Sequence, residues 1–194
     1  MKKRVIFNAL MFVLIAFLGF VLYKQIQEPI AFQAEKDRRE QAIITKLLEI
    51  RKAQEAYRGV TGKFASSFEQ LRDTLKNGRF RIIQVYGDPD DPNNRNVTYD
   101  TAYVAAADSV AKMGIDLDAL GQMPFGDGKQ FEIYADTVSY QQDVVHVVEV
   151  GAAYSDFMGE FASTKFKKYD ERYDPKKKIK FGDRAKPILT GSWE

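Results

Sequence analysis

Residues 5–23 read VIFNALMFVLIAFLGFVLY, and this uncharged stretch decides how the chain is organised. As an α-helix it would span about 28 Å, close to the hydrocarbon thickness of a bilayer. Asn8 is its one strongly polar side chain, so such a helix would have no polar face of the kind found on helices at the surface of globular proteins. We therefore predict a transmembrane helix over residues 5–23, in contact with membrane lipid.

A cleaved secretion signal is the competing interpretation of this stretch, and its flanks argue against cleavage. The basic start Met1-Lys2-Lys3-Arg4 fits either interpretation. The apolar run is however longer than a signal core, and residues 24–28 (KQIQE) follow it instead of a small-x-small cleavage site. We predict an uncleaved single-pass anchor.

The basic residues before the stretch predict its orientation. The positive-inside rule keeps residues 1–4 in the cytoplasm, while the long segment after the anchor can be translocated. The chain has no cysteine, which agrees with a domain outside the cytoplasm. The expected location is the bacterial inner membrane, with the C-terminal domain in the periplasm.

Beyond residue 23 the sequence favours helix, first polar and then amphipathic. Residues 24–41 have almost no apolar stripe and predict a solvated stalk, which Pro29 interrupts as a kink or as the start of a new helix. From residue 42 apolar side chains recur at helical spacing until Gly59 and Gly62 end the pattern; they are Ile43, Ile44, Leu47, Leu48, Ile50, Ala53, Ala56 and Tyr57.

Residues 42–166 are expected to form one α+β domain. Ser66 to Glu69 suggest a capping box that starts a short helix. Alternation after Gly78 predicts a strand, while residues 97–113 fit strand or helix. The clearest strand pair is 130–140 with 143–154, joined at Gln141-Gln142. The predicted fold is a transmembrane helix continuing into a long helix packed on a small antiparallel sheet.

Residues 167–194 are charged and rich in turn residues, so we expect a tail over the surface or along a partner. A basic stretch near the C-terminus is formed by Lys165, Lys167, Lys168 and Lys176 to Lys178. Acids interleave with it, which favours a solvated face over contact with anionic lipid or glycan. Trp193, the only tryptophan, is a candidate interface anchor; the alternative is that it covers the protein's own core.

The sequence carries no recognisable catalytic motif. His146 is the only histidine, no cysteine accompanies it, and we interpret it as a histidine on one face of a sheet. Phosphate-binding loops, dinucleotide fingerprints and nucleophile elbows are missing from the sequence. With 29 basic and 27 acidic residues, a net charge of +2 gives no footprint for nucleic acid. We predict a non-enzymatic protein with no cofactor.

An acidic loop at residues 87–96 is the best metal candidate. The side chains of Asp88, Asp90, Asp91 and Asn93 are hard oxygen ligands of the kind that calcium prefers. The EF-hand spacing is not met, and Pro92 among Asp and Asn also suits an ordinary surface turn. The turn is the favoured interpretation and calcium the alternative.

Tripeptides of Asp, then Ser or Thr, then an aliphatic residue occur four times. They resemble the acceptor motif of a bacterial periplasmic O-glycosylation system, which would also place the domain outside the cytoplasm. The alternative is that Asp and Thr cluster at strand ends and caps for local hydrogen bonding. The candidate acceptors are Thr74, Thr101, Ser109 and Thr137.

The order of parts resembles the type IV pilin and type II secretion pseudopilin family. The resemblance rests on residues 50–57 (IRKAQEAY), 61–64 (TGKF) and 68–71 (FEQL), which look like the pseudopilin stretch where the long helix gives way to a loop and a short helix. The chain lacks that family's cleavage site and its glutamate at the fifth position of the apolar run. The resemblance therefore implies an uncleaved subunit of the assembly-platform kind.

These observations together predict a structural or assembly subunit of a bacterial cell-envelope machine, of the secretion or pilus kind. It would act through contacts with other envelope proteins or with itself. The alternative is a membrane-tethered ligand-binding or sensory domain that uses the acidic loop. A membrane-tethered enzyme ranks last.

Overall fold

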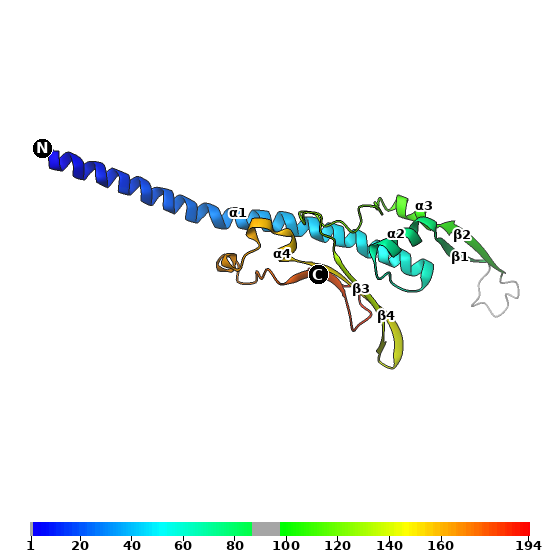
Figure 1. The fold of residues 1–194 in the computed structure, drawn as a ribbon. Helices are drawn as coiled ribbons and strands as arrows, with labels where there is room; N and C mark the ends of the chain where they lie inside the picture. Colours follow the sequence, from blue (N-terminus) through cyan, green and yellow to red (C-terminus); the bar gives the residue numbers. More distant parts are fainter. Residues whose placement is uncertain (1, 87–97) are drawn as a thin grey trace.

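One helix runs from the N-terminus through the body of the protein. The computed structural model describes residues 2–86 and 98–194, and in it α1 extends over Lys2–Thr61. Its 60 residues correspond to a length of about 90 Å. Figure 1 shows the first half of α1 standing alone and the folded part of the chain gathered along the second half. Pro29 lies inside this helix, so the alternative that it starts a new helix is wrong: the helix continues on both sides of the proline.

The second half of α1 forms one wall of the core. Ile43, Leu47 and Ile50 are fully buried, as the 3.6-residue period of the sequence predicts. Gln54 is the buried polar residue of this wall, and its amide bonds both the N–H and the C=O of Ala65. The side chain thereby replaces a backbone partner and fixes the loop after α1. The helix ends before Gly62, whose φ of +78° suits a glycine.

A short helix, α2 (Phe68–Asn77), follows and buries Leu71 and Leu75 against α1. Its predicted start is displaced by one residue. Ser67, not Ser66, is the N-cap, and its side chain accepts a hydrogen bond from the N–H of Gln70. The third residue of the helix, which the capping box uses, is therefore Gln70 and not Glu69. The Gln70 side chain accepts from the Ser66 N–H instead.

The strands form two antiparallel sheets, where the sequence predicted one. β1 (Arg79–Tyr86) pairs with β2 (Thr98–Ala105), and α3 (Ala106–Lys112) follows β2 directly. The ambiguous residues 97–113 thus hold both a strand and a helix. The second sheet has the order β3-β4-β5, from β3 (Glu132–Tyr140) and β4 (Asp143–Ala153) to β5. Gln141 and Gln142 both have positive φ, which confirms the tight turn predicted between β3 and β4.

The predicted charged tail is wrong over much of its length, because β5 (Lys178–Asp183) completes the three-stranded sheet. Ile179 and Phe181 of β5 are buried in the core, where the sheet lies against α1. Between β4 and β5 lie a short helix, α4 (Tyr154–Phe157), and two 3₁₀ turns, η1 (Gly159–Phe161) and η2 (Thr164–Lys168). We call residues 154–175 the C-terminal lobe.

Candidate functional site

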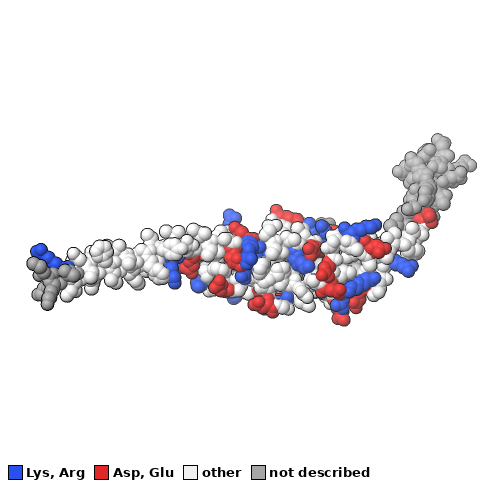
Figure 2. Space-filling view, turned by 90° about the horizontal axis from the view of Figure 1, so that it is seen from above, with Lys and Arg blue, Asp and Glu red and all other residues white. Residues whose placement is uncertain are grey.

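The first half of α1 is the largest exposed apolar surface among the described residues. We call residues 6–23 the apolar arm. Figure 2 shows it as a stretch without charged side chains, while acidic and basic residues gather over the second half of the helix. Within residues 2–86 and 98–194, α1 is the one helix long and apolar enough to cross a membrane, and none of its most apolar window is buried in the protein. The most exposed members are Ile6, Phe7, Leu10, Phe12, Val13, Ile15, Phe17, Leu22 and Tyr23.

One side of the predicted solvated stalk is covered by the C-terminal lobe, while most of the residues in 24–41 stay exposed. Phe32 is fully buried although its neighbours in the sequence are polar. Its ring stacks on Phe166 with centroids 5.0 Å apart and meets Tyr173 edge-on at 5.0 Å. Phe161 and Tyr169 complete the cluster around it. We call these five rings the aromatic clamp. Because each buried ring removes a large apolar area from water, the clamp holds the lobe on α1.

Hydrogen bonds on both sides of the aromatic clamp fix its register along α1. Tyr169 donates through Oη to Glu28 Oε2 at 2.6 Å, and this bond holds the pKa of Glu28 below its usual value. Lys36 donates through Nζ to Asp170 Oδ2 at 2.8 Å and lowers the pKa of that carboxyl. Burial works against the charge on Lys36, but the bond to Asp170 outweighs it and raises the pKa of the ammonium.

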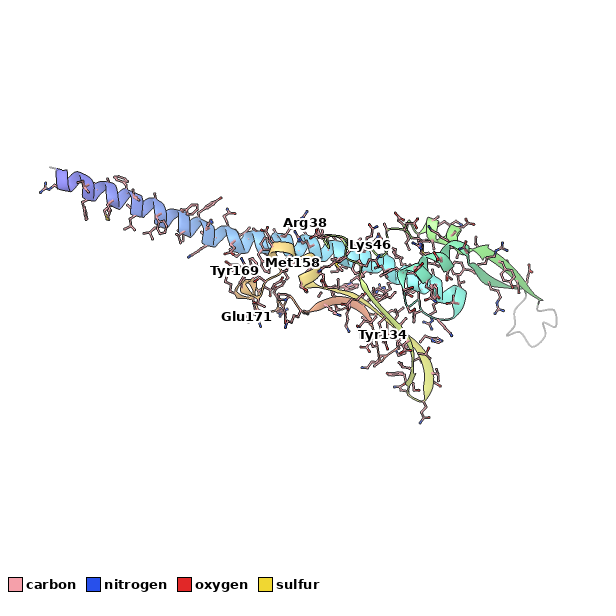
Figure 3. The ribbon with its side chains drawn as sticks, in the orientation of Figure 1. Arg38, Lys46, Tyr134, Met158, Tyr169 and Glu171 are labelled. Carbon is pink, nitrogen blue, oxygen red and sulfur yellow. The ribbon has the colours of Figure 1, made fainter. Side chains whose placement is uncertain are left out.

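The end of the lobe farther from the apolar arm is held on α1 by two further hydrogen bonds. Arg39 donates through Nη1 to the carbonyl oxygen of Phe157 at 2.6 Å, and Tyr154 donates through Oη to Glu40 Oε1 at 2.5 Å. Burial, followed by the bond to Glu40, raises the pKa of Tyr154. Burial also raises the pKa of Tyr173 to about 12. Both phenols therefore stay neutral at physiological pH and serve as hydrogen-bond donors. Figure 3 labels Met158, fully buried beside these contacts, where the lobe meets α1.

Beside the lobe, the same segment is also contacted by a loop from between α3 and β3. Phe125 lies beneath the guanidinium groups of Arg38 and Arg39, 4.9 and 5.1 Å from its ring centroid. Both arginines also bond Glu35, and these bonds lower the pKa of Glu35 to about 2. Phe125 has a φ of +60°, which is uncommon for a large residue. Residues 31–41 are thus held by both the lobe and this loop.

The predicted metal ligands lie outside the described residues. Asp88, Asp90, Asp91 and Asn93 belong to residues 87–97, so the structure does not bear on the calcium alternative. Within residues 2–86 and 98–194, no group of three or more His, Asp or Glu side chains is placed to hold a metal ion.

The candidate glycosylation acceptors differ in exposure and lie on four different elements. Thr101 is exposed on β2, while Thr74 in α2 and Ser109 in α3 are half-buried. Thr137, exposed on β3, has its Oγ1 2.8 Å from Nδ1 of His146 on the paired strand β4. This contact agrees with the interpretation of His146 as a residue on a sheet face. The glycosylation motif stays a prediction.

Trp193 lies half-buried against the core of its own chain. It packs near Glu40, Ile44 and Tyr154, and the stretch around it is held by an isolated bridge between Gly191 and Phe181 of β5. This is the placement expected of a residue that covers the core. An additional contact with a partner stays a prediction.

Sequence reasoning missed the aromatic clamp. Phe32 is a single aromatic residue in the polar segment AFQAEKDRREQ, too little for a periodic signal. The available signal was in residues 161–173, where Phe161, Phe166, Tyr169 and Tyr173 place four aromatic rings across the boundary between the predicted domain and the predicted tail.

Comparisons with protein-family models, with curated proteins and with solved structures find no match for this chain.

Proposed function

We propose that the protein is a single-pass, non-enzymatic subunit of a bacterial cell-envelope assembly, anchored in the inner membrane by the apolar arm, with its folded part in the periplasm. The observation that carries the proposal is the continuity of α1. The helix whose first half is bare and apolar forms, in its second half, the wall of the domain core. In water the exposed apolar side chains of the arm would carry a free-energy cost. Inside a bilayer they contact hydrocarbon, and this cost disappears.

The attachment between arm and domain supports a structural role. A flexible tether would suit a domain that only needs to stay near the membrane. Here the aromatic clamp and the Lys36–Asp170 pair fasten the lobe within a few turns of the arm, so the position of the domain follows the helix. Such coupling suits a part that must hold other subunits at a defined distance from a bilayer.

Two hairpins supply surfaces for those contacts. The β1–β2 hairpin and the β3–β4 hairpin both project from the body of the domain (Figure 1). Each carries a large exposed apolar side chain, Tyr103 on β2 at 63% exposure and Val144 on β4 at 73%. Strands at sheet edges keep unpaired backbone groups that can bind another chain.

Site-specific photo-crosslinking in living cells tests this function. A photoreactive amino acid is placed at Tyr103 or Val144 in the full chain, and at Glu55 as a control on an exposed, polar position of α1. We expect a discrete crosslinked product of defined mass at one or both hairpins and none at Glu55. Carbonate-resistant, membrane-inserted protein that gives no product at either hairpin would contradict the assembly role while leaving the anchor intact.

A further inference from the structure

The C-terminal lobe is the part of the folded domain closest to the apolar arm. Lys168 Nζ lies 3.6 Å from Glu28 Oε2, beside the bond that Tyr169 makes to the same carboxylate. Glu28 follows the last residue of the arm, Tyr23, by five positions, which is a rise of about 7–8 Å along the helix. Figure 1 shows the lobe, in orange and brown, as the end of the domain nearest the bare half of α1.

That distance matches the polar layer of a bilayer. A hydrocarbon core of about 30 Å within a total thickness of about 40–45 Å leaves a headgroup layer of roughly 5–8 Å on each side. With the arm in the hydrocarbon core, η2 therefore lies at the level of the headgroups. Lys24, the first residue after the arm, lies at the same boundary.

The surface of the lobe at this level is basic. Lys165, Lys167, Lys168 and Arg172 are exposed, and we call these four residues the basic edge. Of the three acids in residues 159–173, Asp170 is already engaged by Lys36, which leaves Glu160 and Glu171. Figure 3 shows Glu171 on the side of the lobe away from α1. Among the described residues, no carboxylate lies within ion-pair distance of Lys165 or Lys167.

The aromatic clamp holds two of these lysines in place. Lys165 Nζ lies 4.5 Å from the ring centroid of Phe166, and Lys168 Nζ lies 4.4 Å from that of Tyr169. Both rings pack against Phe32 of α1. The ammonium groups are therefore carried by the element that fixes the lobe on the helix, so their height above the arm is set by the fold.

We propose that the basic edge binds the anionic headgroups of the bilayer that holds the arm. This inference rests on the proposed anchoring. Lysines close to an anionic bilayer surface are attracted to it over about a Debye length, and salt weakens the attraction. The contact gives the protein a second attachment beside the helix, which restrains the tilt and rotation of the domain relative to the membrane.

The test uses the full chain in nanodiscs of phosphatidylcholine alone or with phosphatidylglycerol. Labelling by an amine-reactive reagent is followed by mass spectrometry at Lys165 and Lys167, with Lys52 and Lys63, exposed at the far end of the domain, as internal controls. We expect labelling of the two lobe lysines about fivefold slower in the anionic discs, the difference vanishing at high salt, and no change at the controls.

A second measurement separates lipid contact from a change of fold. Because the chain has no cysteine, Thr164→Cys provides a unique label on the lobe for energy transfer to labelled headgroups. We expect Lys165→Gln and Lys167→Gln together, with Lys168 kept because it pairs with Glu28 of α1, to reduce the transfer in anionic discs to the level in phosphatidylcholine. The matched pair Lys52→Gln and Lys63→Gln should leave the transfer unchanged.

The outcomes distinguish this inference from the function on which it rests. Insertion of the chain with equal labelling in both lipids overturns the lipid contact and leaves the anchor standing. Failure of the chain to insert into either disc overturns the anchor and the lipid contact together.

Discussion

The two halves of α1 differ in composition and meet opposite surroundings. In the arm, apolar side chains face every direction, no charged residue interrupts them, and none of its most apolar window is buried. In the second half, charged residues are frequent and the apolar side chains occupy one stripe, where Ile43, Leu47 and Ile50 are fully covered. A helix with one apolar stripe can bury it against its own domain, whereas a helix that is apolar on all sides needs apolar surroundings on all sides.

The strongest test of this comparison places charge on the arm. Leu14→Arg with Phe17→Arg should cost about 5–7 kcal/mol of insertion free energy, because each arginine near the helix centre costs about 2.5–3.5 kcal/mol. We expect the variant to leave the carbonate-resistant membrane fraction. Leu14→Ile with Phe17→Leu is the matched control and should stay in it. If the double arginine variant remained membrane-embedded, the arm would not be the anchor.

The next test concerns the point where the covered half of α1 begins. Phe32→Ala removes the centre of the aromatic clamp and should destabilise the lobe by about 3–5 kcal/mol, as for other buried phenylalanines. Denaturant titration followed by Trp193 fluorescence measures the loss, since Trp193 lies against Tyr154 at the base of the lobe. Ile30, two residues earlier and 58% exposed, is the control, and Ile30→Ala should change stability by less than about 0.5 kcal/mol. Equal losses for the two variants would mean that the lobe does not pack on α1.

The sequence predicted those parts whose signal is local. The stripe from Ile43 to Tyr57 repeats at helical period, and the pair β3–β4 alternates on either side of a two-residue turn, so both were found. The uncharged stretch of the arm is equally local. None of these elements needs information from a distant part of the chain.

The lobe could not be predicted, because its signal is spread across the chain. Lys36 and Asp170 are 134 residues apart in the sequence. Each lies in a segment whose own sequence is mostly polar, so neither segment by itself indicates the contact. The burial of Phe32 depends on four rings that only tertiary contact brings to it. The same reason explains β5: Lys178, Lys180 and Asp183 make the strand look like a charged tail, and only its pairing with β4 places Ile179 and Phe181 in the core against α1.

Pro29 sharpens the comparison at the junction of the two halves. The helix continues through it although proline lacks the N–H that would bond the carbonyl four residues earlier. Pro29→Ala should therefore stabilise this part of α1 by up to about 3 kcal/mol, slowing amide exchange over residues 26–33. Pro29→Gly, which restores the N–H but not the helix propensity, should give a smaller effect. Faster exchange in Pro29→Ala would mean that the missing N–H of the proline does not weaken α1 at this point.

The smallest expected effect is electrostatic and depends on pH. The Lys36 bond holds the pKa of Asp170 below its ordinary value of 3.8. Folding therefore favours the ionised carboxylate, so the contribution of the pair is complete above about pH 4 and is lost as the pH falls through the lowered pKa. Asp170→Asn should cost about 1 kcal/mol at pH 7 and remove this acid-dependent component.

Glu171, the exposed neighbour of Asp170, supplies the matched control for that measurement. Urea titrations read by Trp193 fluorescence at pH 7 and pH 3 should show the wild type and Glu171→Gln weakening together on acidification, and Asp170→Asn weakening less. Glu28, whose pKa the Tyr169 bond also lowers, will keep part of the acid response in all three proteins. An unchanged difference between the two pH values in Asp170→Asn would mean that the Lys36–Asp170 pair does not hold the lobe, and that the aromatic clamp and the remaining hydrogen bonds to α1 keep the covered half of the helix covered.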